Sequence, residues 1–175
     1  EPEETVGKLW HDMAEGMGAG VHHPGAAVAL ADVRISLGVL FRALGGAAGV
    51  ELLEAPAQLV QHQRSLRRRV AVERDKIQIA SFDGNGLRLP TVMDCFADPA
   101  LNRAAYFWLT AVAACTDVEA MALPHSGLDP YEFDKAQIAA NALSSARAYA
   151  RCLGLQSAYA EMIGLILAGR PQLAL

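Results

Sequence analysis

Charged side chains are scarce in this 175-residue chain. They make up 19% of the residues, whereas hydrophobic residues make up 53%. An average soluble domain has about 25% charged residues, and a surface short of charge often lies partly against a partner. The formal net charge of −4 also argues against general binding to nucleic acid.

Long apolar runs and paired cysteines are missing as well. Charges or glycines interrupt every apolar stretch well before the roughly 20 residues that a membrane span needs, so no membrane insertion is expected. The acidic start, Glu1-Pro2-Glu3-Glu4, is unlike a secretory signal. The three cysteines, Cys95, Cys115 and Cys152, are odd in number and widely spaced, which indicates reduced thiols and a cytoplasmic protein.

Sequence motifs for catalysis and cofactor binding are also absent. The chain has no phosphate-binding loop, no G-x-G-x-x-G, no G-x-S-x-G and no C-x-x-C. His22 and His23 are adjacent, so they cannot both face one metal ion from a regular element, and solvated loop histidines are favoured over a zinc site. We therefore expect a protein that is not an enzyme, with no cofactor and no metal site.

Apolar residues recur at helical spacing over most of the chain. The pattern predicts five to six helices, with Asp32, Asp98 and Asp129 as capping residues, and Gly45-Gly46 and Gly154 as stop signals. The helix from Asp98 is apolar nearly all round and is expected to be central, with Trp108 in the core. The expected ranges are 5–17, 33–44, 57–69, 98–115, 129–152 and 156–168.

Two short regions have strand character instead. Residues 50–54 read as a strand, and residues 70–90 read as a β-hairpin around Asp83-Gly84-Asn85-Gly86, closed by Pro90. The chain is thus predicted to be one mainly α domain, covering residues 1–175, with a small β-hairpin insertion.

Two features are candidates for binding a partner protein. Arg64, Arg67 and Arg68 would share one face of a helix, although a solvated face is the favoured alternative. Ile35 and Val39 lie opposite the main apolar stripe of their predicted helix, which suggests contacts on both sides. The consecutive aromatic residues at 106–108 are interpreted as core rather than as a binding hot spot.

Several short motifs follow one another along nearly the whole chain. They are Val6-Gly7-Lys8-Leu9-Trp10-His11, Leu37-Gly38-Val39-Leu40-Phe41-Arg42-Ala43-Leu44-Gly45-Gly46, Leu87-Arg88-Leu89-Pro90, Ala100-Leu101-Asn102-Arg103 with Tyr106 and Trp108-Leu109, Ala139-Ala140-Asn141-Ala142, Gly154-Leu155 with Tyr159, and Arg170-Pro171. The order and spacing of these motifs, rather than any one of them, resemble the N-terminal domain of the CbbO/NorD family.

The resemblance implies a non-catalytic adaptor that docks on a hexameric MoxR-type AAA+ ATPase of the CbbQ or NorQ kind. Such an adaptor directs the ATPase to a client enzyme, Rubisco in one branch and nitric oxide reductase in another. Family members continue into a C-terminal von Willebrand factor A domain with a D-x-S-x-S metal site. This chain has no such motif, so that site cannot be transferred to it. The alternative is a self-associating structural module with no ATPase partner.

Overall fold

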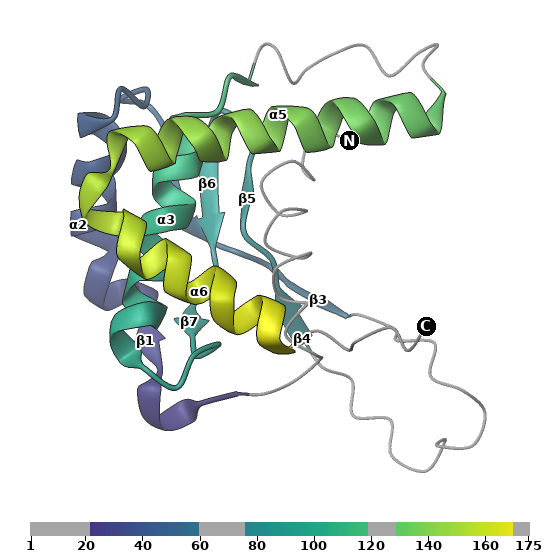
Figure 1. The fold of residues 1–175 in the computed structure, drawn as a ribbon. Coiled ribbons are helices and arrows are strands. Elements are labelled where there is room, and N and C mark those ends of the chain that lie inside the picture. The colour runs from purple at the N-terminus through teal and green to yellow at the C-terminus, as the bar shows by residue number, and fades with distance from the viewer. Residues whose placement is uncertain (1–21, 60–75, 119–128, 170–175) are drawn as a thin grey trace, which may run out of the picture.

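The computed structural model describes residues 22–59, 76–118 and 129–169 (Figure 1). Within these ranges the chain forms four α-helices and seven short strands. The helices are α2 (Leu30–Ala43), α3 (Pro99–Ala114), α5 (Pro130–Arg151) and α6 (Gln156–Gly169), and the 3₁₀ turns are η2 (Pro24–Ala26) and η4 (Leu153–Leu155). The expectation of a mainly helical chain is confirmed, but four helices are described where five to six were expected.

Helix α3 is the centre of the fold, as its sequence predicts. The Asp98 carboxylate accepts a hydrogen bond from the Ala100 backbone N–H at 2.8 Å, and Pro99 occupies the first helical position. The helix contacts α2, α5 and α6. Trp108 is 1% exposed and Tyr106 is fully buried, so the core assignment of these two aromatic residues is confirmed.

The strands form three small sheets beside the helices. Strand β1 (Val28–Ala29) pairs antiparallel with β7 (Val92–Met93), and β3 (Ala57–Leu59) pairs antiparallel with β4 (Lys76–Gln78). The third sheet has the order β2-β6-β5, made of β2 (Glu51–Glu54), β6 (Gly86–Leu89) and β5 (Ser81–Phe82). Strands β5 and β6 form a hairpin around the predicted turn, but it is shorter than the hairpin expected over residues 70–90, because Lys76–Gln78 pair with β3 instead. Strand β2 is the predicted strand near residue 50.

The turn of this hairpin is built by one aspartate. Asp83 Oδ1 accepts hydrogen bonds from the backbone N–H groups of Asn85 at 2.9 Å and Gly86 at 2.8 Å. Gly84 has a φ of +89°, a conformation that suits glycine. Asp83 Oδ2 also pairs with Arg88 at 2.7 Å. The predicted turn is therefore stabilised by both backbone and ionic contacts.

Two expectations about helix boundaries are wrong. Helix α2 begins at Leu30 rather than after Asp32, because the Leu30 N–H donates to the Thr91 carbonyl at 2.9 Å, so a distant strand segment replaces the side-chain cap. The helix expected over 57–69 begins instead as strand β3. The remainder of that range and the helix expected over 5–17 lie outside the described residues.

Helices α5 and α6 meet at η4 and diverge (Figure 1). The axes of Lys135–Arg151 and Leu153–Gly169 are bent by 103°. Within the described ranges, no single helix is both long enough and apolar enough to cross a bilayer; only this bent pair, taken together, has the length and composition.

Candidate interaction surfaces

The outer face of α2 carries exposed apolar side chains. Ile35 is 85% exposed and Val39 is 62% exposed, whereas Val33 and Leu37 on the opposite side are fully buried. Arg34 donates to the Leu52 carbonyl and ties α2 to strand β2. The described residues therefore cover only one of the two apolar stripes of α2, and a partner contact at Ile35 and Val39 stays a prediction.

The predicted basic patch cannot be placed beside this face. Arg64, Arg67 and Arg68 lie outside the described residues. The chain enters that segment from β3 and leaves it into β4, and these two strands pair with Leu59 opposite Lys76. The two ends of the segment are therefore held close together, and its role in binding remains a prediction.

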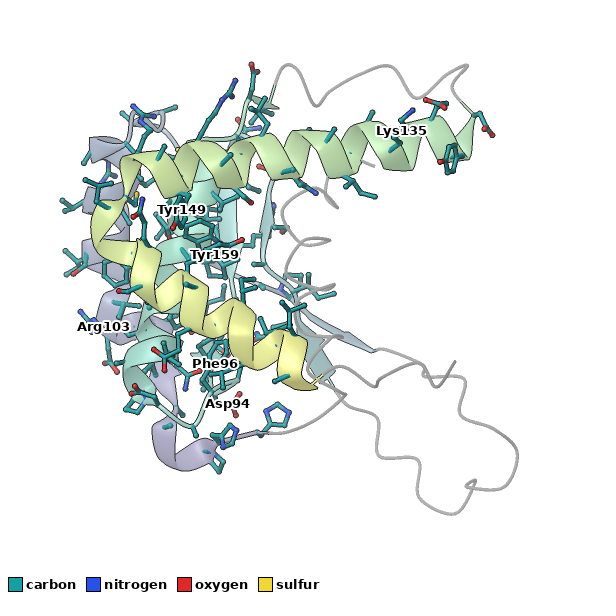
Figure 2. The ribbon with its side chains drawn as sticks, viewed as in Figure 1. Asp94, Phe96, Arg103, Lys135, Tyr149 and Tyr159 are labelled. Carbon is teal, nitrogen blue, oxygen red and sulfur yellow. The ribbon has the colours of Figure 1, made fainter. Side chains whose placement is uncertain are left out.

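Three aromatic rings from three helices contact one another, from the buried Trp108 to the exposed Tyr149. Trp108 of α3 stacks on Tyr159 of α6 with ring centroids 3.9 Å apart, and Tyr149 of α5 meets Tyr159 edge-on at 5.9 Å. Tyr149 and Tyr159 lie between α5 and α6 (Figure 2). The stack joins the two C-terminal helices to the central helix, so its main role is packing.

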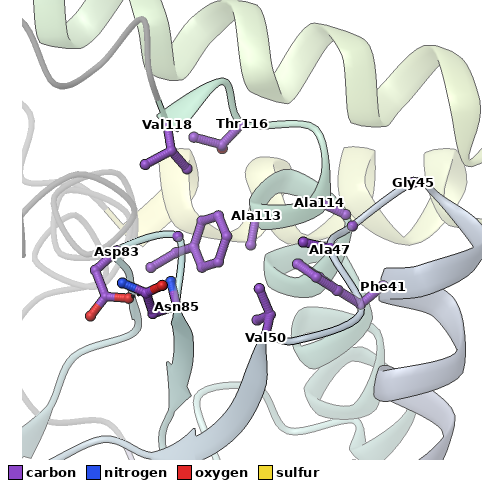
Figure 3. Close-up of a pocket in the computed structure, with 13 residues that line it drawn as sticks. Phe41, Gly45, Ala47, Val50, Asp83, Asn85, Ala113, Ala114, Thr116 and Val118 are labelled. Atoms are coloured by element: carbon purple, nitrogen blue, oxygen red, sulfur yellow. Dashed lines mark hydrogen bonds between the residues drawn. The ribbon is translucent and has the colours of Figure 1, made fainter.

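A pocket of about 410 Å³ opens between the α2–β2 loop, the β5–β6 turn and the C-terminal end of α3 (Figure 3). Its residues are Phe41, Gly45, Gly46, Ala47, Val50, Phe82, Asp83, Gly84, Asn85, Ala113, Ala114, Thr116 and Val118.

The chemistry of this pocket does not suggest catalysis. Among the described residues that line it, Asp83 is the one ionisable side chain. Its hydrogen bond with Arg88 lowers the pKa of Asp83 from 3.8 to about 2, so it is ionised and already paired near neutral pH. An efficient general acid or base needs a pKa close to the working pH. The paired Asp83 is therefore not suited to that role.

The histidines and thiols form no metal site in the part of the chain that the structure describes. No group of three or more potential ligands gathers there. Nδ1 of His22 lies 3.0 Å from the Asp94 carboxylate at the surface. Cys95, Cys115 and Cys152 are free thiols. Burial raises the pKa of Cys95 to about 11, so that thiol is a poor nucleophile.

Sequence reasoning missed two charged residues on the outer face of α2. Asp32 was interpreted as a cap and Arg42 was not singled out, yet both are exposed on the same side as Ile35 and Val39. The signal that could have found them is the spacing of 32, 35, 39 and 42, which puts all four residues on one helical stripe.

Comparison with known proteins gives relatives but no structural match. The chain is 35% identical to protein NorD of Brucella suis over 173 residues, which is 98% of this chain and 27% of that protein. It is 36% identical over 114 residues to protein NorD of Stutzerimonas stutzeri and 40% identical over 114 residues to an uncharacterised protein of Pseudomonas aeruginosa; each match covers 65% of this chain and 18% of the relative.

No protein-family model and no solved structure matches the chain. The chain spans about a quarter of the length of the Brucella relatives, so their whole-protein activity is not thereby shown for it. The similarity nevertheless covers nearly every residue of the chain. The chain is therefore homologous to part of the NorD proteins and is NorD-like.

Proposed function

We propose that this chain is a non-catalytic adaptor module of a NorD-like protein that acts in the cytoplasm and docks on a hexameric MoxR-type AAA+ ATPase. The observation that supports the proposal is the 35% identity to NorD proteins over 98% of the chain. The motif resemblance implies an ATPase of the CbbQ or NorQ kind, and the NorD relatives favour the NorQ kind. A CbbQ-type ATPase is the corresponding partner if the chain belongs to the Rubisco branch.

The proposed role is to direct the work of the ATPase to a client enzyme. The NorD relatives favour nitric oxide reductase as the client over Rubisco. ATP turnover then belongs to the ATPase partner, and contact with the client belongs to the full-length protein.

We propose that Arg64, Arg67 and Arg68 form the docking element. The chain is acidic overall, so three closely spaced arginines stand out, and a partner's carboxylates would relieve their mutual repulsion. Charges at the rim of an interface act mainly on the association rate and on its salt dependence. The pairing of β3 with β4 holds Leu59 and Lys76, the two residues that bound this segment, opposite each other.

The test is binding to purified NorQ-type and CbbQ-type hexamers, with the ATPase rate as a second readout. Reversing Arg64, Arg67 and Arg68 to glutamate should slow association and flatten its salt dependence while circular dichroism stays unchanged. A matched control reverses three cations elsewhere, Arg103, Lys135 and Arg147, which are exposed. The control changes the net charge equally and should bind nearly as fast as wild type.

The possible outcomes separate the parts of the proposal. Binding to one hexamer only would identify the branch. Equal association rates for wild type and the arginine variant at low salt would remove those arginines from the docking element. Absence of binding to both hexamers, or ATP turnover by the repurified chain alone, would overturn the adaptor function.

A further inference from the structure

The outer face of α2 carries two apolar side chains flanked by two charged side chains. With 100° between successive residues, Ile35 and Val39 lie about 20° on either side of the direction opposite Leu37. Asp32 and Arg42 lie about 40° on either side of it. All four side chains are exposed, whereas Leu37 is fully buried. An apolar centre is thus flanked by an acidic residue toward one end of α2 and a basic residue toward the other.

This arrangement is complementary to itself under a two-fold rotation. Positions 35 and 39 are equally distant from 37, and so are positions 32 and 42. A two-fold axis through the exposed face at the level of Leu37 places position 35 of one helix opposite position 39 of the other. The same axis places position 32 opposite position 42. Such an arrangement is the requirement for an isologous contact, in which each residue meets its counterpart twice.

We propose that a second copy of this chain docks on this face, with the two α2 helices antiparallel. Ile35 of each copy then packs on Val39 of the other, about 3 Å along the helix from the two-fold axis. Asp32 of each copy pairs with Arg42 of the other, about 7.5 Å along the helix from the two-fold axis. The contact has an apolar core between two ion pairs of matched sign. Charge complementarity of the face with itself selects a second copy as the occupant.

The side chains are available for these contacts. Arg42 Nη1 donates to the Gly38 carbonyl at 3.2 Å, which leaves other N–H groups of the guanidinium for a carboxylate. Asp32 lies in the first turn of α2, and its side chain is exposed. Ala31 and Ala43 flank the stripe and are small enough to let the helices approach.

One helix pair makes a small interface. Stable complexes bury about 1,200–2,000 Å² in total, so a contact limited to α2 forms a weak, reversible dimer. The inference is independent of ATPase docking, because that proposal rests on Arg64, Arg67 and Arg68 and not on α2.

Sedimentation velocity of the full 175-residue chain over a wide concentration range tests the inference. We expect a monomer–dimer equilibrium. Ile35→Glu should weaken it at least about tenfold in Kd, a loss of about 1.4 kcal/mol. The matched control is Leu153→Glu, at a leucine on η4 that is 73% exposed and lies off the face; it should dimerise like wild type.

Charge complementation provides the decisive measurement. Asp32→Arg places two arginines opposite each other twice in a homodimer, and Arg42→Asp does the same with two aspartates, so each variant alone should be monomeric. In a mixture, one Asp32→Arg chain and one Arg42→Asp chain restore both ion pairs. The mixture should therefore form a dimer that neither variant forms alone, which misfolded chains could not do.

Three results would overturn the inference. They are a wild-type chain that stays monomeric at its highest concentration, a dimer that Ile35→Glu leaves intact, and a mixture of the two charge variants that stays monomeric. If the wild type is monomeric and Ile35→Glu instead loses binding to the ATPase hexamer, the occupant of this face is the ATPase rather than a second copy.

Discussion

The side-chain amide of Asn102 satisfies both backbone groups of Phe96. Oδ1 accepts from the Phe96 N–H at 2.9 Å, and Nδ2 donates to the Phe96 carbonyl at 2.8 Å. Nδ2 also donates to the Ala26 carbonyl at 2.9 Å. All of this is buried, so one side chain on α3 joins the segment before that helix to the start of the described chain.

Asn102→Ala should therefore destabilise the fold by about 2–4 kcal/mol, because it leaves three buried backbone groups without their partner. Urea unfolding followed by circular dichroism measures the change. The control is Ser144→Ala, which removes a buried hydroxyl that donates to the Ala140 carbonyl of its own helix at 3.0 Å. Its cost should stay below about 1 kcal/mol, and equal losses for the two variants would contradict the bridging role of Asn102.

The second prediction separates the two contributions of Trp108. Trp108→Ala should cost about 3–5 kcal/mol, because the ring is buried and stacked on Tyr159. Trp108→Phe should cost clearly less, because Nε1 has no hydrogen-bond partner among the described residues and its replacement breaks no hydrogen bond to them. The measurement is the free energy of unfolding, and a Phe variant as unstable as the Ala variant would contradict the expectation that an aromatic ring at this position retains most of the stability.

The third prediction concerns acid. Since Arg88 lowers the folded-state pKa of Asp83 to about 2, its charge stabilises the fold above the unfolded value of 3.8. That contribution is lost as the pH falls from about 4 to about 2. Asp83→Asn should cost about 1 kcal/mol at pH 7, and the difference from wild type should shrink below pH 4.

Unfolding at a series of pH values measures this dependence. A useful comparison is Glu132→Gln, which removes the charge of an exposed residue 3.7 Å from Lys135. That exposed pair should contribute little at any pH. A difference between wild type and Asp83→Asn that stays constant down to pH 2 would show that the Asp83 charge is not the source of the stabilisation.

The fourth prediction tests the end of α2. Gly45 has a φ of +94°; its N–H donates to the Arg42 carbonyl, while the Gly46 N–H donates to the Phe41 carbonyl. This is a Schellman ending, in which a left-handed residue suits glycine. Gly45→Ala should cost about 1–2 kcal/mol through backbone strain alone, because nothing lies within 4 Å of an added methyl group.

Gly49 provides the matched control, since it also has open space around it but its φ is not positive. Gly49→Ala should be neutral or stabilise by up to about 1 kcal/mol, because it restricts the unfolded chain. Thermal unfolding of both variants measures the contrast. Equal melting temperatures for the two variants would refute the role of the Gly45 conformation.

Features with local causes could be predicted from the sequence. Asp98-Pro99 begins α3 through a capping bond to the next turn, and Gly45-Gly46 ends α2 through short-range backbone bonds. The β5–β6 turn follows from Asp83, whose partners lie within five residues. Two of the four residues on the outer face of α2 could be predicted, because Ile35 and Val39 lie opposite the main apolar stripe.

Features with distant causes could not be predicted. The start of α2 depends on Thr91, and strand β3 pairs with β4, joining Ala57 to Gln78. Gln78 further bonds to the Ala55 carbonyl and to Thr91, at 2.7 Å and 2.8 Å. These partners leave no periodic signal in the local sequence, because the start of α2 and the β3–β4 pairing use backbone groups that every residue carries. The Gln78 side-chain amide finds its partners 13 and 23 residues away.

The sequence by itself determined that α2 has two apolar stripes, because helical spacing sorts Val33 and Leu37 from Ile35 and Val39 whatever surrounds them. Only the tertiary structure decided which stripe is covered. Helix α3 packs on α2 and buries Leu37, while Ile35 remains exposed. Periodicity in the sequence defines the faces of a helix, but the packing of the other elements decides which face is buried.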